Sequence, residues 1–132
     1  MKLIIAYVQP FKLGDVTRAL QDLPEFPGLS VADVNGFGQQ KAAEGKHKTV
    51  EDLIDYAKKV KIETVVPDER MEEVRETILR AAHTGNKGDG KIFVLDVEIA
   101  VRVRTGETGR DALWSPLGDP ERFHDRPEAH RQ

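Results

Sequence analysis

The last apolar stretch of the chain limits the possible folds most strongly. Every odd-numbered position from Phe93 to Val103 holds a large apolar residue, and charged residues dominate the even positions from Asp96 onward. Strict alternation over this length is typical of a strand and hard to produce on a helix. The pattern therefore predicts one strand from Lys91 to Thr105, well beyond the usual length of about 5–6 residues. A strand that extends beyond its own sheet often pairs with another chain, because its unpaired edge exposes backbone N–H and C=O groups.

The rest of the chain predicts a complete set of elements for a ferredoxin-like domain. Apolar or alternating runs indicate three further strands, and apolar residues at helical spacing indicate two helices. The second helix is expected to bury a stripe that includes Met71, Ile78 and Leu79. The predicted order is strand 2–8, helix 13–23, strand 29–34, strand 60–66, helix 68–82 and strand 91–105. This βαββαβ order predicts an α+β fold, in which both helices cover one face of a four-stranded antiparallel sheet. The apolar open face is expected to be covered by other subunits.

Composition narrows the classes of protein. The 132 residues indicate one domain. The net charge of -3 argues weakly against general nucleic-acid binding, and the absence of cysteine excludes disulfides and thiolate metal sites. The short apolar opening lacks the form of a signal peptide, and no segment is long enough to span a bilayer, so the cytoplasm is the expected location. We expect a domain over residues 1–112 and a flexible or loosely docked extension over 113–132.

A glycine-rich loop and a pair of arginines form a candidate phosphate site. Residues 84–91 hold three glycines and two lysines, and such loops can turn their backbone amides toward one anion. Arg102 and Arg104 would share one face of the last strand, about 6.6 Å apart, a spacing that suits successive phosphates. The alternative is a glycine-rich turn beside a solvated strand end, which the generic pattern alone favours. The loop is not a Walker A motif.

The polar segment 39–58 lacks the periodicity of a core element. About 20 residues without a core pattern are unusual inside a compact domain and are often functional. Thr49 to Asp52 resembles a capping box, so a short amphipathic helix could form there, for example on a partner. A disordered hydrophilic loop is an equally good interpretation.

Together these features resemble the PII signal-transduction proteins over residues 1 to about 112. The strongest likeness is Thr84-Gly-Asn-Lys-Gly-Asp-Gly-Lys-Ile-Phe-Val94, which is similar to the family's C-terminal signature. The segments that start at Val34, Lys59 and Arg102 match in order and spacing. The resemblance implies a ferredoxin-like homotrimer that binds adenine nucleotides in three clefts between subunits. It also implies that the long loop, called the T-loop (about 39–58), docks onto transporters, enzymes or regulators.

The resemblance also assigns residues to the nucleotide. It implies phosphate contacts from the glycine loop and the arginines, base and ribose contacts from a second group, and a cleft lining from two further residues. The three sets are Gly88, Asp89, Gly90, Lys91, Arg102 and Arg104; Gly36, Gly38 and Val65; and Val8 and Ser30.

Other implied positions concern the outer phosphate and a second effector. Gln40 matches a glutamine that helps to hold magnesium with ATP and 2-oxoglutarate, and Lys59 matches a lysine that pairs with that acid. Gln39 replaces the family's usual arginine near the outer phosphate, and Ala42 replaces a glycine where the backbone wraps the oxo-acid. Asp52 stands where some relatives carry a tyrosine that is uridylylated. These departures indicate a divergent branch.

The sequence thus predicts a trimeric sensor of ATP, ADP or AMP, with Mg²⁺ as an accompanying ion, that binds rather than catalyses. It would regulate a membrane transporter or enzyme in nitrogen or carbon metabolism through its T-loop. One alternative is a small nucleotide hydrolase that uses Asp89 with magnesium. Others are a trimeric adaptor whose nucleotide site has decayed, and a PII-like sensor of another small effector such as bicarbonate.

Overall fold

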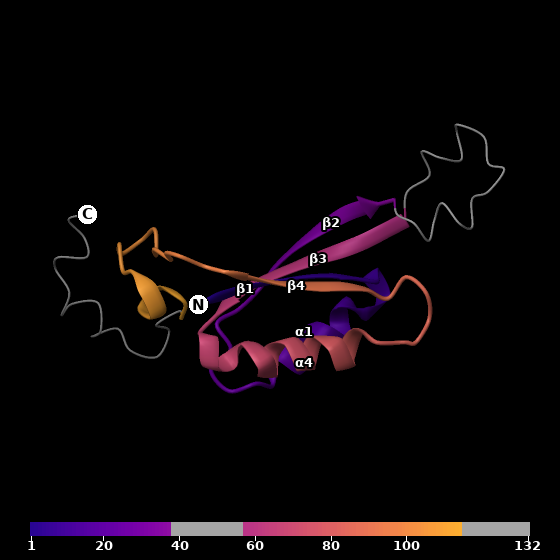
Figure 1. The fold of residues 1–132 in the computed structure, drawn as a ribbon, viewed down its shortest axis with the longest axis horizontal. Coiled ribbons are helices and arrows are strands. Elements are labelled where there is room, and N and C mark those ends of the chain that lie inside the picture. The colour runs from indigo at the N-terminus through magenta and orange to yellow at the C-terminus, as the bar shows by residue number, and fades with distance from the viewer. Residues whose placement is uncertain (38–56, 115–132) are drawn as a thin grey trace.

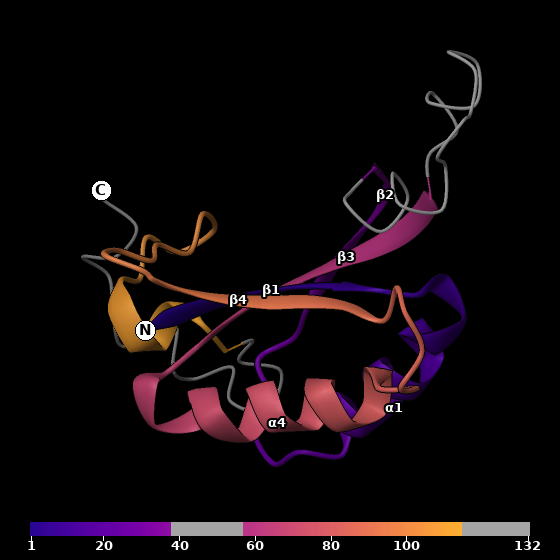
Figure 2. The same ribbon diagram turned by 45° about the vertical axis from the view of Figure 1, so that its right-hand side comes forward.

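The structure, a computed structural model, describes residues 1–37 and 57–114. A four-stranded sheet forms one layer, and two helices lie against one of its faces (Figures 1 and 2). Three 3-10 turns complete the description. In chain order the elements are β1 (Lys2–Val8), η1 (Pro10–Lys12), α1 (Leu13–Gln21), β2 (Ser30–Gly36), β3 (Ala57–Val66), η2 (Asp68–Arg70), α4 (Met71–Ala82), β4 (Gly90–Asp96) and η3 (Gly109–Ala112).

The sheet has the order β2-β3-β1-β4, and every neighbouring pair is antiparallel. β1 lies at the centre, where Ile4 pairs with Thr64 of β3 and with Val94 of β4. The ferredoxin-like βαββαβ arrangement predicted from the sequence is therefore confirmed. This topology places the loop before β4 beside the end of β1.

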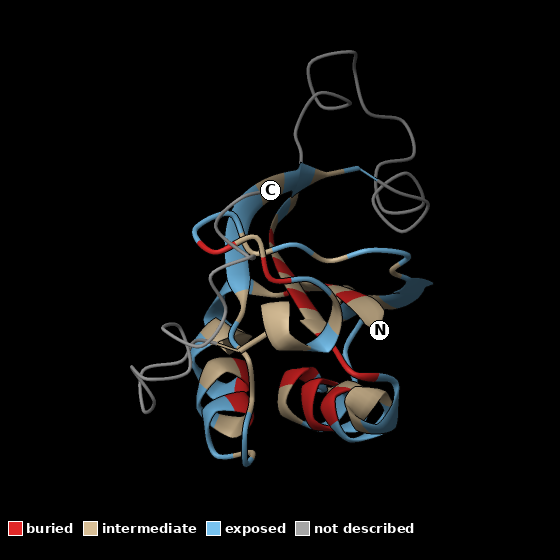
Figure 3. Ribbon diagram, turned by 90° about the vertical axis from the view of Figure 1, so that its left-hand side faces the viewer, coloured by how far each residue is buried: buried red, intermediate tan, exposed pale blue. Residues whose placement is uncertain are grey.

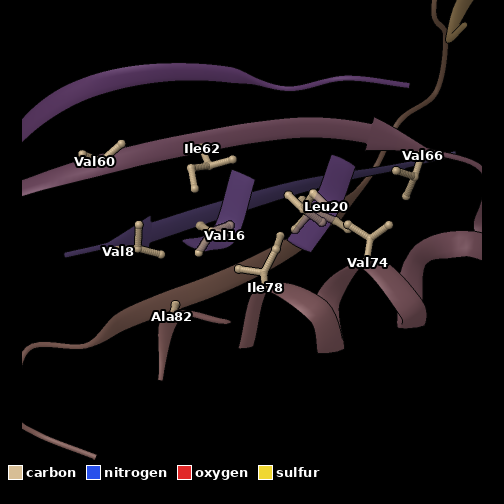
Figure 4. Close-up of a cluster of buried hydrophobic side chains, with 11 residues drawn as sticks. Val8, Val16, Leu20, Val60, Ile62, Val66, Val74, Ile78 and Ala82 are labelled. Atoms are coloured by element: carbon tan, nitrogen blue, oxygen red, sulfur yellow. The ribbon is translucent and has the colours of Figure 1, made fainter. Parts of the chain in front are cut away.

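The core lies between the sheet and the helices. Alternate residues of β1, namely Ile4, Ala6 and Val8, face α1 and α4 and are almost fully buried. Figure 3 shows the buried residues gathered on the facing sides of the two layers, and Figure 4 shows their side chains meeting. Each buried Val, Leu or Ile contributes about 1.5–3 kcal/mol. The cluster comprises Ile4, Ala6, Val8, Val16, Leu20, Val60, Ile62, Val66, Val74, Ile78 and Ala82.

One residue of the predicted helical stripe faces solvent. Leu79 is 48% exposed, whereas Val74, Ile78 and Ala82 are buried. These three follow an exact spacing of four residues, which keeps them on the side that packs against α1 and the sheet. Leu79 lies one residue further around the helix and points away from the core. Thr77, which was not predicted as a core residue, is buried on the helix face that packs against the core.

β3 begins earlier than the sequence pattern indicated. Ala57 and Lys58 belong to the strand and pair with Gly36 and Asn35 of β2. They are therefore not part of the loop predicted over 39–58. The remainder of that segment, including the capping box at 49–52, lies outside the described residues.

The predicted strand from Lys91 to Thr105 is wrong in its second half. β4 ends at Asp96, and the amide of Val97 makes one more bond, 3.1 Å long, to the carbonyl of Met1. β1 begins at Lys2, so the described chain offers no neighbour to the residues beyond. The chain instead folds back on itself, and Val101 forms an isolated antiparallel bridge with Thr108. Apolar alternation indicates which face of an extended segment each side chain is on, but it does not indicate whether a partner strand is present.

Candidate functional site

The glycine loop (residues 84–91) connects α4 to β4 and is held together by one carboxylate. Oδ2 of Asp89 accepts hydrogen bonds from the amides of Thr84 (2.8 Å) and Gly85 (2.9 Å). The hydroxyl of Thr84 donates to Oδ1 of the same group. Both oxygens of Asp89 therefore hold the loop closed, and the shape of the loop is fixed locally.

These contacts also set the protonation of Asp89. The hydrogen bond from the Thr84 hydroxyl, followed by those from the backbone amides of Thr84 and Gly85, lowers the pKa of Asp89 to about 2. Hydrogen bonds to the charged form of a carboxylate stabilise that form. The carboxylate thus keeps its charge down to acidic pH, and it is an acceptor within its own loop rather than a proton donor.

Two side chains from outside the loop bind its backbone. Nε2 of Gln9 donates to the carbonyl of Gly88 at 2.7 Å, and the ammonium of Lys59 donates to the same oxygen. Lys59 was predicted to bind an effector acid. Gln9 was not predicted, because it lies 79 residues away and no local pattern links it to the loop.

Gly90 marks the closest approach between the loop and the sheet. Its φ is 115°, and a Cβ at this position would lie 1.7 Å from the carbonyl oxygen of Tyr7. An L-residue with a side chain fails on both counts, through backbone conformation and through overlap. The glycine is therefore required where β4 starts to pair with the end of β1.

A cleft of about 240 Å³ lies beside the glycine loop. Val8, Leu79 and Ile92 give it an apolar lining, and Arg75, His83 and Lys91 bring basic groups to it. Asp89 and Gly90 line it as well, so the predicted phosphate loop borders a concave surface. Tyr7, Arg75 and His83 are lining residues that sequence reasoning did not identify.

The predicted arginine pair lies in a hairpin, not on a strand. In this arginine hairpin (residues 100–109), the amide of Arg102 donates to the carbonyl of Glu107 at 2.8 Å. The amide of Gly106 in turn donates to the backbone carbonyl of Arg102 at 2.7 Å. Gly106 has a φ of 72°, which the tight turn requires. The predicted strand spacing between Arg102 and Arg104 therefore does not apply.

Arg102 is held inside the hairpin while Arg104 is exposed. Nη2 of Arg102 donates to the carbonyl of Asp111 at 3.0 Å, and its Nε lies 3.7 Å from Oε1 of the buried Glu107. Among the described residues, that Nε has no hydrogen-bond acceptor although it is buried. A buried donor without an acceptor costs about 1–3 kcal/mol, so the guanidinium is incompletely satisfied.

The glycine loop and the arginine hairpin lie at opposite ends of β4 (Figure 1). The seven residues of β4 rise about 3.3 Å each, which separates the two regions by roughly 20 Å. One copy of the chain therefore does not bring the predicted phosphate residues together.

The other predicted site residues are spread along the sheet. Gly36 ends β2 opposite Ala57, Ser30 pairs with Glu63, and Val65 pairs with Leu3. Val8 belongs to the core and lines the cleft beside the glycine loop. Gly38, Gln39 and Gln40 lie outside the described residues, as does Ala42.

Known proteins match this chain over most of its length. The family described as "Nitrogen regulatory protein P-II" matches residues 1–107. The chain belongs to the P-II family. The resemblance drawn from the glycine loop, the strand segments and the arginine segment is confirmed.

Individual P-II relatives agree in sequence and in fold. The nitrogen regulatory protein P-II of Haemophilus influenzae is 46% identical over 113 residues, covering 86% of this chain and all of that protein. The nitrogen regulatory protein GlnK2 of Haloferax mediterranei is 49% identical, with 86% and 91% covered. A crystal structure of Arabidopsis thaliana PII bound to citrate has a TM-score of 0.70 and 37% identity, with 86% and 90% covered.

Membership of the P-II family makes the chain a signal-transduction regulator of nitrogen metabolism by class. Within residues 1–37 and 57–114, no three His, Cys, Asp or Glu side chains gather as a metal site would require. No helix in the same ranges is long and apolar enough to cross a membrane.

Proposed function

We propose that this P-II protein binds an adenine nucleotide, ATP, ADP or AMP, in clefts between the subunits of a homotrimer. Nucleotide occupancy would then control a partner, a transporter or a metabolic enzyme, through the segment 39–56 that leads into β3. The observation that carries the proposal is the separation of two phosphate-type elements to opposite ends of one sheet.

Two copies of the chain can combine what one copy keeps apart. The glycine loop offers the exposed Lys91 and a backbone shaped by Asp89, and the arginine hairpin offers Arg102 and Arg104. When the hairpin of one copy meets the loop of the next, lysine and arginines surround a common point. Arginine binds phosphate in bidentate fashion and lysine adds a compact charge, which is suitable chemistry for a di- or triphosphate.

The outer face of the sheet supplies the surface for such an assembly. Phe93 is 48% exposed and Leu95 is 46% exposed, although both lie in the middle of β4. They pair with Ile5 and Leu3 of β1, and Phe93 also meets Tyr7 edge to face at 6.3 Å between ring centroids. A continuous apolar sheet face on a single chain favours burial against other copies.

The alternative of a hydrolase that uses Asp89 has less support. Both oxygens of Asp89 accept hydrogen bonds from the glycine loop, and these contacts use three of the roughly four acceptor positions of the carboxylate. The pKa of about 2 also makes Asp89 a poor general base. A role as the clasp of a binding loop explains the same contacts.

A second effector would compete with an existing contact. Lys59 donates to the carbonyl of Gly88, so an acid such as 2-oxoglutarate, or bicarbonate, would draw this ammonium away from the loop. The effector would thereby change how firmly the loop is held. Gln40, which was predicted to help hold Mg²⁺, lies outside the described residues. We propose the Mg²⁺ ion at this site only when ATP is bound.

Calorimetry with ATP, ADP and AMP tests the proposal. Magnesium, 2-oxoglutarate and bicarbonate are added in turn to identify the second effector. Arg102→Ala and Arg104→Ala should each lose about 1–3 kcal/mol of binding free energy, the scale of a charged hydrogen bond. Arg80→Ala, at an exposed arginine on α4, is the matched control and should bind as the unmodified chain does. A folded trimer that binds none of the three nucleotides would refute the proposal.

A further inference from the structure

The segment after the arginine hairpin is fixed to two distant parts of the molecule. The guanidinium of Arg110, on η3, forms an ion pair with Glu69 of η2. Nε1 of Trp114 donates to the carbonyl of Glu25, in the loop after α1, at 2.7 Å. Arg110 also stacks over the Trp114 ring, 5.1 Å from its centroid. We call residues 110–114 the C-terminal clamp; Figure 2 shows η3 beside the start of the α4 segment.

The clamp makes direct contact with the arginine hairpin. The carbonyl of Asp111, which lies between Arg110 and Trp114, accepts the 3.0 Å hydrogen bond from Nη2 of Arg102. The residues on both sides of Asp111 are attached to η2 and to the α1 loop, and these attachments restrain Asp111 in that position. The direction of the Arg102 guanidinium therefore depends on contacts with Glu69 and Glu25.

The contacts of the clamp differ in expected strength. The Arg110–Glu69 pair is more than half exposed on both sides, 56% and 54%, and such exposed pairs contribute little to stability. Trp114 combines a hydrogen bond to a backbone carbonyl with a cation–π contact, and both are less weakened by solvent than an exposed ion pair. Trp114 should therefore be the dominant anchor.

The acceptor of Trp114 is itself held in an unusual conformation. Glu25 has a φ of 55°, the one positive value among the described residues other than glycine. This conformation is unfavourable for a residue other than glycine, so surrounding contacts must stabilise it. The hydrogen bond from Trp114 is one such contact, and it links the conformation of the α1 loop to that of the clamp.

We infer that Trp114, assisted by Arg110, is a positioning residue for Arg102 in the nucleotide site. Trp114 does not touch the phosphate; it fixes the Asp111 carbonyl and thereby presets the guanidinium toward the ligand. Preorganisation of this kind improves affinity because less freedom is lost on binding. The inference rests on the proposed nucleotide function. Both clamp residues lie beyond the stretch 1–107 that matches the family.

Comparing the Kd for ADP with the Kd for adenosine distinguishes a positioning role of Trp114 from a general structural defect. In Trp114→Ala, the Kd for ADP should rise roughly fivefold to tenfold, equivalent to about 1–1.4 kcal/mol, while the Kd for adenosine should stay unchanged. Trp114→Phe keeps an aromatic ring but lacks the donor, so it should give a smaller rise in the Kd for ADP. Melting curves and the oligomeric state of each variant show whether it is folded. If Trp114→Ala does not fold, the comparison is made with Trp114→Phe.

Trp114 is also the chain's single tryptophan, so its fluorescence reports on the clamp directly. ADP should change the emission of the unmodified chain and should not change that of Arg102→Ala, in which the link through Asp111 is cut. If folded Trp114 variants bind ADP as tightly as the unmodified chain, the inference is overturned and the proposed function is not. An equal loss of affinity for ADP and adenosine has the same consequence. An unmodified chain that binds no nucleotide would overturn the proposed function and the inference together.

Discussion

The glycine loop and the arginine hairpin are built in opposite ways. The loop is closed by its own Asp89, and two side chains reach it, Gln9 from just after β1 and Lys59 from β3. The hairpin lies beyond the end of the sheet and holds Arg102 through Asp111, whose position depends on η2 and the α1 loop. One half of the proposed site is therefore part of the rigid domain, whereas the other half is attached to it by a few contacts.

This difference suggests how the two halves share the work of binding. A loop with locally satisfied hydrogen bonds offers the same shape to every ligand. The hairpin holds its arginine through distant contacts and leaves it incompletely satisfied, so a phosphate can supply a further acceptor. In a trimer, each cleft would combine a half closed by its own loop from one subunit with a half held by distant contacts from the next.

The largest expected effect comes from adding one methyl group to the rigid half. Gly90→Ala should destabilise the fold by about 3 kcal/mol or more, because its Cβ would overlap the Tyr7 carbonyl and its φ is 115°. Gly109→Ala, in the hairpin, is the matched control: its φ is 70° but no atom lies within 4 Å of the added Cβ, so it should cost only about 1 kcal/mol. Urea unfolding measures both. Equal costs would mean that the close approach of Gly90 to the Tyr7 carbonyl does not constrain the loop.

Mixed trimers test whether the halves come from different subunits. Lys91→Ala and Arg102→Ala should each weaken ATP binding by about 1–3 kcal/mol. When the two variant chains are refolded together, each mixed trimer contains one cleft with an intact lysine and an intact arginine. Calorimetry should therefore detect a fraction of sites with the original affinity. If the site lay within one chain, mixing would restore nothing.

The clasp of the glycine loop predicts a dependence of stability on pH. Because the folded-state pKa of Asp89 is lowered to about 2 from an ordinary value near 3.8, its contribution is fully present above about pH 4. It is lost as pH falls toward 2. Urea unfolding should thus show Asp89→Asn less stable than the unmodified chain at pH 7, with the gap closing toward pH 2. Asp22→Asn, at the exposed end of α1, is the control; a gap independent of pH would contradict the clasp.

The smallest effect is expected at the ion pair of the clamp. Arg110→Ala should change the free energy of unfolding by no more than about 1 kcal/mol, because both partners are more than half exposed. The difference should shrink further in 1 M salt, where charges are screened over about 3 Å. A loss as large as that from Trp114→Ala, in the same unfolding assay, would show that the charge and not the tryptophan anchors the clamp.

Much of the fold followed from patterns within single elements. The apolar run in β1, the alternation in β3 and the helical spacing of apolar residues in α4 predicted the correct elements and most of the core, since burial selects apolar residues. Leu79 was assigned to the wrong face, because a stripe one residue too wide fits the same periodicity. The alternation from Val97 to Val103 predicted a strand that has no partner within the described chain.

The candidate site shows the same division. The glycine loop was recognisable from its spacing and its family signature, and Gly90 proved to be a position that excludes any side chain. The contact of Gln9 with Gly88 and that of Trp114 with Glu25 join residues 79 and 89 positions apart. No local pattern encodes such contacts, because they depend on which ends of the elements meet.

The sequence by itself determined the order of the elements, the family and the chemical character of the two phosphate-type regions. Those properties depend on periodicity and residue type, which are local. Only the tertiary structure decided that the two regions lie at opposite ends of β4, that Asp89 closes its own loop and that Trp114 anchors the segment behind Arg102. These are relations between distant parts of the chain, and they are fixed by packing of the sheet and helices rather than by any one stretch of residues.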